Sequence, residues 1–179
     1  SGTVWVSALI KGSGNSGGDA VGIVLQGSTN NLFAGFDGGF SASNTLMGIG
    51  TASAGTVWND TVSGFASAGN FSNTTTHLIV LELNLTTNST KLYVDPTAGQ
   101  STPPAVPGAT LSLAIGTFSG MGFNSINPNG TFDEFRVGTT FGDVVGVAAV
   151  PEPHQYALVG ALLFAIAFMR RRRMVANIR

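Results

Sequence analysis

HLIVLELNLTTNSTKLYVDP, residues 77–96, is the stretch that decides the fold. Apolar residues dominate its first half and return in KLYVD from Lys91, in the short runs that indicate strands. The Thr, Asn and Ser residues between the two runs, about four or five in number, adopt turn geometry readily. The stretch therefore predicts a β-hairpin, and with it an antiparallel sheet.

Further apolar runs of similar length recur along the chain, each bounded by Gly, Asn or Ser. They are VWVSALIK from Val4, AVGIVLQ from Ala20, NLFAGF from Asn31, LSLAIG from Leu111 and FDEFRVG from Phe132. Short strands at this spacing are typical of antiparallel sandwiches, and no helical periodicity is visible before the C-terminal tail. The pattern predicts an all-β sandwich with surface loops over residues 64–76 and over the proline-containing residues 102–108.

Charge is distributed unevenly along the chain. Residues 1–146 hold three basic side chains, Lys11, Lys91 and Arg136, against eight carboxylates, a formal balance of 3 − 8 = −5, whereas the remainder holds five arginines and one glutamate. The acidic body argues against nucleic acid as a partner. Its strands carry Thr, Ser and Asn rather than Lys and Glu. That surface suits hydroxylated matrices or packing between like subunits, unless the composition reflects only a bias of the organism.

The C-terminal tail combines prolines, an apolar run and a basic cluster. Residues 156–169 carry no charge, and a helix of that length spans about 21 Å against a hydrocarbon core of about 30 Å. Flanking residues can snorkel and the bilayer can thin, so the segment can cross a membrane marginally. Pro151 and Pro153 mark where the helix can begin. The arginines that follow it predict a cytoplasmic C-terminus and an external body.

The same tail closely resembles the PEP-CTERM sorting signal of Gram-negative bacteria that make exopolysaccharide. The sorting motif is Pro151, Glu152 and Pro153, the membrane helix covers about residues 155–169, and the membrane stop is Arg170, Arg171, Arg172 and Arg173. The resemblance implies recognition by an exosortase, cleavage near the motif, and passage through the inner membrane to the cell surface or extracellular matrix. An uncut, permanent anchor is the alternative. His154 departs from the Ser or Thr that is more usual after the motif.

The body resembles a group of PEP-CTERM proteins through FDEFRVGTTFGDVV from Phe132, WVSALIK near the start, and the hairpin stretch. The resemblance implies a concanavalin A-like, LamG-type jelly roll over residues 1–146, joined by a linker at residues 147–150 to the sorting signal at residues 151–179. Full-length relatives carry further sequence before this point. We therefore expect that an export signal and the first strands precede Ser1, which would leave the sheets incomplete.

Catalytic constellations are not evident in the body. A retaining glucanase needs two carboxylates about 5–5.5 Å apart, but the glutamates are only Glu82, Glu134 and Glu152, and no suitably spaced acidic motif occurs. His77 and His154 are the only histidines, and the chain lacks cysteine, so neither a His-based triad nor a zinc site is expected. The sequence predicts a non-enzymatic protein. The alternative is a carbohydrate-active, glucanase-like enzyme whose catalytic residues lie further upstream.

Candidate ligand-binding residues are few. Asp19, Asp37, Asp60 and Asp95 lie in or beside expected loops and could supply oxygen ligands to calcium, although turn residues that bond their own backbone are the more common case. Trp5, Trp58 and Tyr93 could stack on sugar rings, but we expect Trp5 and Tyr93 to belong to the core. The chain is thus expected to be an exported surface or matrix protein that binds polysaccharide or packs against like subunits.

Overall fold

The computed structural model describes residues 2–12, 20–36, 46–52, 62–125 and 130–146. The chain divides into two units, Ser1–Gly146 and Val147–Arg179, and every described residue belongs to the first. The expected linker, sorting motif, apolar helix and basic stop therefore lie outside the described residues. In the part that is described, no helix is long and apolar enough to cross a membrane.

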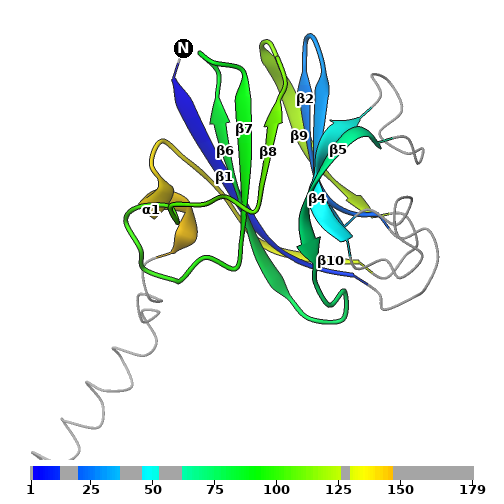
Figure 1. The fold of residues 1–179 in the computed structure, drawn as a ribbon, viewed down its shortest axis with the longest axis vertical. Coiled ribbons are helices and arrows are strands. Elements are labelled where there is room, and N and C mark those ends of the chain that lie inside the picture. Colours follow the sequence, from blue (N-terminus) through cyan, green and yellow to red (C-terminus); the bar gives the residue numbers. More distant parts are fainter. Residues whose placement is uncertain (1, 13–19, 37–45, 53–61, 126–129, 147–179) are drawn as a thin grey trace, which may run out of the picture. The chain divides into compact units, whose positions relative to one another are not determined.

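Within the described ranges, ten strands form two antiparallel sheets that face each other, so the expectation of an all-β sandwich is confirmed (Figure 1). Sheet A has the order β10-β1-β6-β7-β8 and sheet B has the order β5-β4-β3-β2-β9. The strands are β1 (Thr3–Lys11), β2 (Val21–Gly27), β3 (Asn31–Phe36), β4 (Leu46–Ala52), β5 (Val62–Asn70), β6 (His77–Asn84), β7 (Ser89–Val94), β8 (Ala109–Ser112), β9 (Phe118–Ser125) and β10 (Thr131–Gly138).

The predicted hairpin is confirmed as β6 and β7, which pair in register with Leu81 opposite Leu92. Two local features form the turn in the four residues between the strands. The side-chain oxygen of Asn84 accepts hydrogen bonds from the backbone N–H groups of Thr86 and Thr87, and Asn88 adopts a positive φ of 53°, which asparagine tolerates better than most residues. The polar linker thus fixes the register of both strands.

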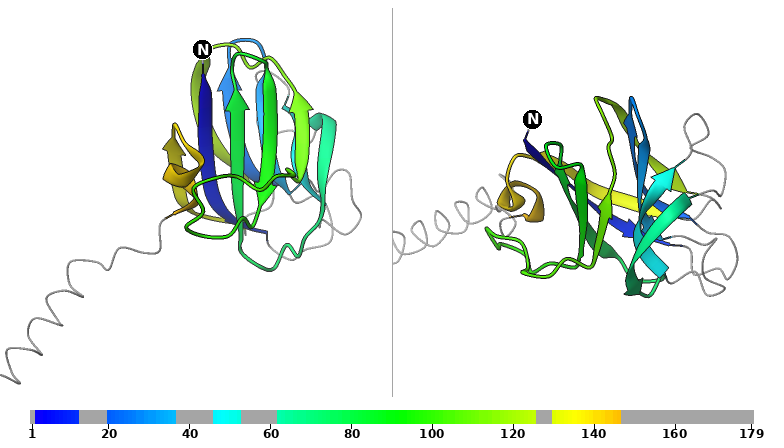
Figure 2. Two further views of the ribbon diagram at one scale, coloured as in Figure 1. Left: turned by 60° about the vertical axis from the view of Figure 1, so that its left-hand side comes forward. Right: turned by 45° about the horizontal axis from the view of Figure 1, so that its top comes forward.

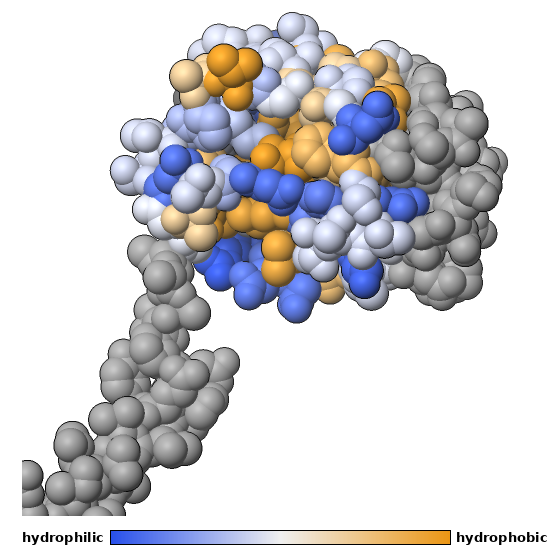
Figure 3. Space-filling model, turned by 60° about the horizontal axis from the view of Figure 1, so that its bottom comes forward, coloured by the Kyte–Doolittle hydropathy of each residue, from blue (hydrophilic) through white to orange (hydrophobic). Residues whose placement is uncertain are grey.

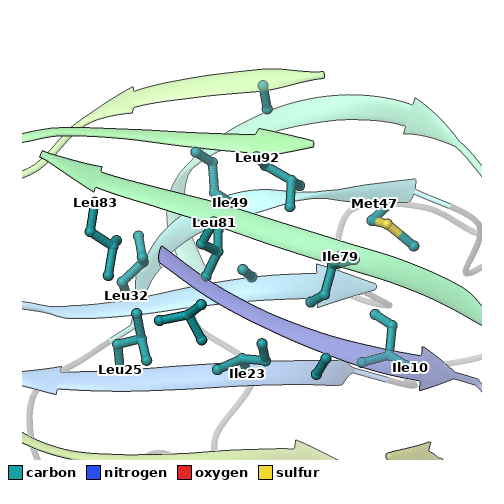
Figure 4. Close-up of a cluster of buried hydrophobic side chains, with 14 of the residues drawn as sticks. Ile10, Ile23, Leu25, Leu32, Met47, Ile49, Ile79, Leu81, Leu83 and Leu92 are labelled. Carbon is teal, nitrogen blue, oxygen red and sulfur yellow. The ribbon is translucent and has the colours of Figure 1, made fainter. Parts of the chain in front are cut away.

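The core lies between the sheets and is built from alternate residues of each strand. Because side chains in a strand point to opposite faces in turn, Val6, Ala8 and Ile10 face sheet B while Trp5 and Ser7 face away from it. Figure 4 shows the interior, where aliphatic side chains of the two sheets meet: Ile10, Ile79, Leu81, Leu83 and Leu92 from sheet A, and Ile23, Leu25, Leu32, Met47 and Ile49 from sheet B.

Two expectations from the sequence were wrong: a loop was expected where β5 forms, and β8 was expected to extend further than it does. Residues 64–76 were expected to form a loop, but β5 runs to Asn70 and pairs with β4 along its length. Its Gly, Ala and Ser residues follow no apolar alternation, and the strand exists because β4 supplies its hydrogen-bonding partner. Strand β8 ends at Ser112, earlier than the run from Leu111 suggested. The loop expected over residues 102–108 is confirmed.

A single-turn helix, α1 (Phe141–Val145), lies against the outer face of sheet A (Figure 2). This helix was not predicted, because five residues are too few to show a helical period. The side-chain oxygen of Asp143 accepts hydrogen bonds from the backbone N–H groups of Thr139 and Thr140 at 3.0 and 2.8 Å, which satisfies donors at the start of the helix. Three apolar side chains of α1 are buried against the sheet.

Candidate functional site

Polar side chains gather on the outer face of sheet A, beyond the area that α1 covers. The strand register places Glu82 beside Trp5 on one side and Lys91 on the other, with Thr110 next in the row. The adjoining row on the same face runs Thr3, Asn84, Ser89 and Ser112 across four strands. We call these seven residues, Thr3, Glu82, Asn84, Ser89, Lys91, Thr110 and Ser112, the polar face. All of them are exposed or half-buried.

The carboxylate of Glu82 organises the centre of the polar face. Lys91 Nζ donates to both of its oxygens at 3.0 and 3.1 Å, and the Tyr93 hydroxyl donates to Oε2 at 3.0 Å. Burial first, and then the hydrogen bond and charge of Glu82, raise the pKa of Tyr93 well above its usual range, so the hydroxyl stays protonated. Glu82 is therefore a fixed acceptor, while the third ammonium hydrogen of Lys91 can turn toward a ligand.

The polar face has little net charge and many neutral hydrogen-bonding groups. Lys91 and Glu82 cancel each other, and the remaining members are Thr, Ser and Asn. Such a surface can offer donors and acceptors to the hydroxyl groups of a neutral sugar chain.

Glu82 and Asp133, two carboxylates of sheet A, lie far apart. Glu82 lies opposite Trp5 and Asp133 lies opposite Leu9, so the two acids are four residues apart along β1, about 13 Å at the usual rise per residue. A retaining glycosidase holds its two carboxyl groups about 5–5.5 Å apart. Glu82 and Asp133 therefore do not form a pair of this kind.

Asp95 is the one calcium candidate that lies within the described residues; Asp19, Asp37 and Asp60 lie outside them. Its carboxylate is 2.6 Å from Nδ1 of His77 and accepts a hydrogen bond from the backbone N–H of Leu78 at 2.9 Å. Both oxygens thus hold the start of β6 rather than face an open site. In the described ranges, no three His, Asp or Glu side chains are grouped to bind a metal ion.

His77 begins β6, as the sequence predicted, and fastens the preceding loop. Nε2 is 2.9 Å from the backbone oxygen of Ser72, and the ring packs edge-on against Phe36 and Phe71 at centroid distances of 5.8 and 5.5 Å. Both ring nitrogens lie within hydrogen-bonding distance of oxygen atoms. The residue is thus built into the structure.

Trp5 and Tyr93 are buried beneath α1, at 7% and 4% exposure, which confirms the expectation that they belong to the core. Phe141 packs edge-on against Trp5 with 5.3 Å between ring centroids. Neither residue is available to stack on a sugar ring. Trp58 lies outside the described residues.

One apolar surface was not predicted from the sequence. Met121, Phe123, Phe132, Phe135 and Val137 form an apolar cluster on β9 and β10, which we call the edge patch, and all except the half-buried Phe132 are exposed. Figure 3 brings the lower side of Figure 1 forward and shows apolar surface among strongly polar residues. Apolar residues two apart in MGF and FRV were a signal, but their exposure depends on strand order.

No protein-family model matches the chain, and no curated protein matches it either. The function must therefore be inferred from the residues and their arrangement.

Proposed function

We propose that this chain is an exported, non-enzymatic protein of the cell surface or extracellular matrix of a Gram-negative bacterium, which binds the cell's own exopolysaccharide or packs against like subunits. The observation that carries the proposal is the tail: the prolines of residues 151–153, an uncharged run, and four consecutive arginines follow one another in the order of a PEP-CTERM signal. An exosortase would be its processing partner. The chain would pass through the inner membrane before it reaches the cell surface or the matrix.

The body is proposed to be a concanavalin A-like, LamG-type jelly roll. The strand order supports this. Strands β1 and β10, far apart in sequence, are neighbours in sheet A, as are β2 and β9 in sheet B. The chain crosses from one sheet to the other at the β1–β2, β5–β6, β8–β9 and β9–β10 connections, and in jelly rolls too the chain passes between two packed sheets. That fold serves lectins, enzymes and adhesive modules alike, so the binding function has to rest on the surface rather than on the fold.

The polar face is the proposed contact for polysaccharide. Its Thr, Ser and Asn side chains can exchange hydrogen bonds with sugar hydroxyl groups, and Lys91 can donate while it remains paired with Glu82. Because this pair cancels its own charge and the body is acidic, strongly anionic polymers are disfavoured and binding should depend little on salt.

A pull-down with purified exopolysaccharide tests the proposal on the full chain. Replacing Thr110 with Val and Ser112 with Ala removes two exposed hydroxyl groups while keeping residues that strands accept, and we expect retention to fall several-fold. Thr131→Val is the matched control, since Thr131 is exposed on the same face but lies about 20 Å away along β1. Equal retention of all three proteins would refute the polar face as the contact.

The same incubation separates the glucanase-like alternative from the binding function. A carbohydrate-active enzyme would release new reducing ends from the polysaccharide over time, whereas a binding protein leaves the polymer length unchanged. Release of reducing ends would favour the enzyme, whereas retention with an unchanged polymer length would favour the binding protein.

A further inference from the structure

The amide group of Asn84, in the polar face, is held in one orientation by the β6–β7 turn. Its Oδ1 accepts hydrogen bonds from the backbone N–H groups of Thr86 and Thr87, both at 3.0 Å. Because a backbone N–H group donates, these two bonds identify the oxygen end of the amide and therefore its nitrogen end. Nδ2, with its two hydrogens, has no partner in the part of the chain that the structure describes.

The ammonium group of Lys91 is also held in place, by Glu82. Two of its three hydrogens are directed at the two carboxylate oxygens, at 3.0 and 3.1 Å, and the Tyr93 hydroxyl donates a further bond to the same carboxylate. The side chain of Glu82 is only 13% exposed, whereas that of Lys91 is 37% exposed. The acceptor oxygens at this point are therefore largely occupied, and the group that meets solvent is a donor.

The fixed hydrogen-bonding groups in this part of the polar face are thus mainly donors. Asn84 lies opposite Ser89, and Lys91 lies two residues beyond Ser89 on β7. Diagonal neighbours of this kind are about 7–8 Å apart, so both donors can reach one sugar unit and its substituent. The hydroxyl groups of Ser89 and Ser112 can donate or accept. A ligand that contacts Asn84 and Lys91 together must bring acceptor oxygens to them.

We propose that the polar face recognises the acyl carbonyl oxygens of a neutral glycan, such as those of O-acetyl or N-acetyl groups, through Asn84 Nδ2 and Lys91 Nζ. A sugar hydroxyl both donates and accepts, so among donors its own hydrogen needs another partner, whereas a carbonyl oxygen only accepts. A donor or acceptor that loses water without gaining a partner costs free energy. This inference rests on the proposed polysaccharide-binding function and names the substituent that the surface selects.

Charge favours a neutral acyl group over a uronate carboxylate, which also only accepts hydrogen bonds. Lys91 is the only cation among the seven residues of the polar face, and Glu82 already pairs with it. Residues 1–146 carry a formal balance of 3 − 8 = −5. An anionic sugar chain would therefore approach a surface of the same sign.

Calorimetric titration of the full chain in mild detergent tests the substituent with three neutral oligosaccharides of equal length and identical linkage. They are cellohexaose, O-acetylated cellohexaose, and chitohexaose, which carries an N-acetyl group on each unit. We expect an acetylated oligomer to bind about tenfold more tightly than cellohexaose, the gain from one or two good hydrogen bonds. Tighter binding of the ester or of the amide then identifies the source of the carbonyl.

Variants of the two donors test the contact itself. Asn84→Asp removes the amide hydrogens and keeps an oxygen for the N–H groups of Thr86 and Thr87, so the preference for acetylated oligomers should be lost. Asn88→Asp is the matched control, because it adds the same charge in the same turn, at an exposed residue whose positive φ aspartate also tolerates. It should keep the preference. Lys91→Met combined with Glu82→Gln removes the other donor without adding charge and should weaken the preference.

Several results would overturn the inference. They are equal affinity for the three oligosaccharides, no binding of any of them, tighter binding of an oligogalacturonate, a preference that survives in Asn84→Asp, or a preference lost equally in Asn88→Asp. The Thr110 and Ser112 variants should weaken binding of every oligosaccharide while the ratio between them stays the same. Retention of the exopolysaccharide together with equal oligosaccharide affinities would leave the binding function standing and refute the selection of acyl groups alone.

Discussion

Removing the aromatic ring of Phe141 is expected to destabilise the body and to expose Trp5. The side chain is 2% exposed and contacts the rings of both Trp5 and Tyr93. About 200 Å² of apolar surface at about 25 cal/mol per Å² gives about 5 kcal/mol as an upper value. A single-turn helix can detach and relieve part of the cavity, so we expect Phe141→Ala to cost about 3 kcal/mol.

The assay is urea unfolding followed by tryptophan fluorescence, in a Trp58→Phe background so that only Trp5 reports. For a body of this length, about 3 kcal/mol corresponds to a fall in Tm of about 10 °C. The emission of native Trp5 should also shift to the red, because water reaches the indole once α1 no longer covers it. Val106→Ala, at an exposed valine, should change neither quantity. A loss below about 1 kcal/mol with unchanged emission would refute the view that Phe141 fastens α1 to the sheet.

Further predictions concern the core, two titrating groups and the tail. Leu81→Ala should cost about 2–5 kcal/mol in urea unfolding, because Leu81 is wholly buried between the sheets; a cost below about 1 kcal/mol would contradict this placement. The backbone N–H of Thr140, with further bonds from Thr140 and Thr139, holds the pKa of Asp143 below its ordinary value. This stabilisation is present above the unfolded pKa and is lost as the pH falls through the folded pKa, so the difference in Tm between wild type and Asp143→Asn should shrink below about pH 4; a constant difference would refute it. Glu82→Gln should lower the pKa of Tyr93 only part of the way, since burial is the larger cause, as ultraviolet titration in a Tyr156→Phe background can show; an unchanged titration would argue against the contact. Replacing Arg170–Arg173 with Gln should abolish C-terminal processing, measured by mass spectrometry of the mature protein, without changing the Tm of the body; normal processing would contradict the sorting proposal.

The strands predicted correctly are those whose residue pattern is complete within a short stretch of chain. The β6–β7 hairpin has two apolar runs and a polar turn within 20 residues, which located both strands, while their register became known only from the structure. Strands β4, β5 and β9 carry Gly at many positions and were missed. Gly48 shows why such residues are needed: a Cβ there would lie 2.7 Å from the ring of Phe65, which packs over the glycine. That contact arises only after strand pairing, so no local pattern reveals it.

The candidate surfaces could be predicted only in part. A surface rich in Thr, Ser and Asn followed from composition, and the polar face agrees with that expectation. Its actual membership depends on which strands are neighbours: Thr3, Asn84, Ser89 and Ser112 come from four strands. The edge patch depends even more on topology, because Phe123 and Phe135 would be buried if β9 and β10 were central strands. Exposure of a strand is a property of the whole fold.

The position of α1 determines how the body would respond to mechanical force at its C-terminal end. A load applied at Gly146 pulls first on α1, which is held by apolar packing and by the bond from Ser7 Oγ to the backbone oxygen of Val144. Once α1 yields, tension reaches β10 at Gly138, beside Trp5 at the edge of sheet A. That strand would then peel away one residue pair at a time, a geometry that resists far less than shearing two strands along their length. The single turn of helix would thus detach first under load, before the strands of the sandwich separate.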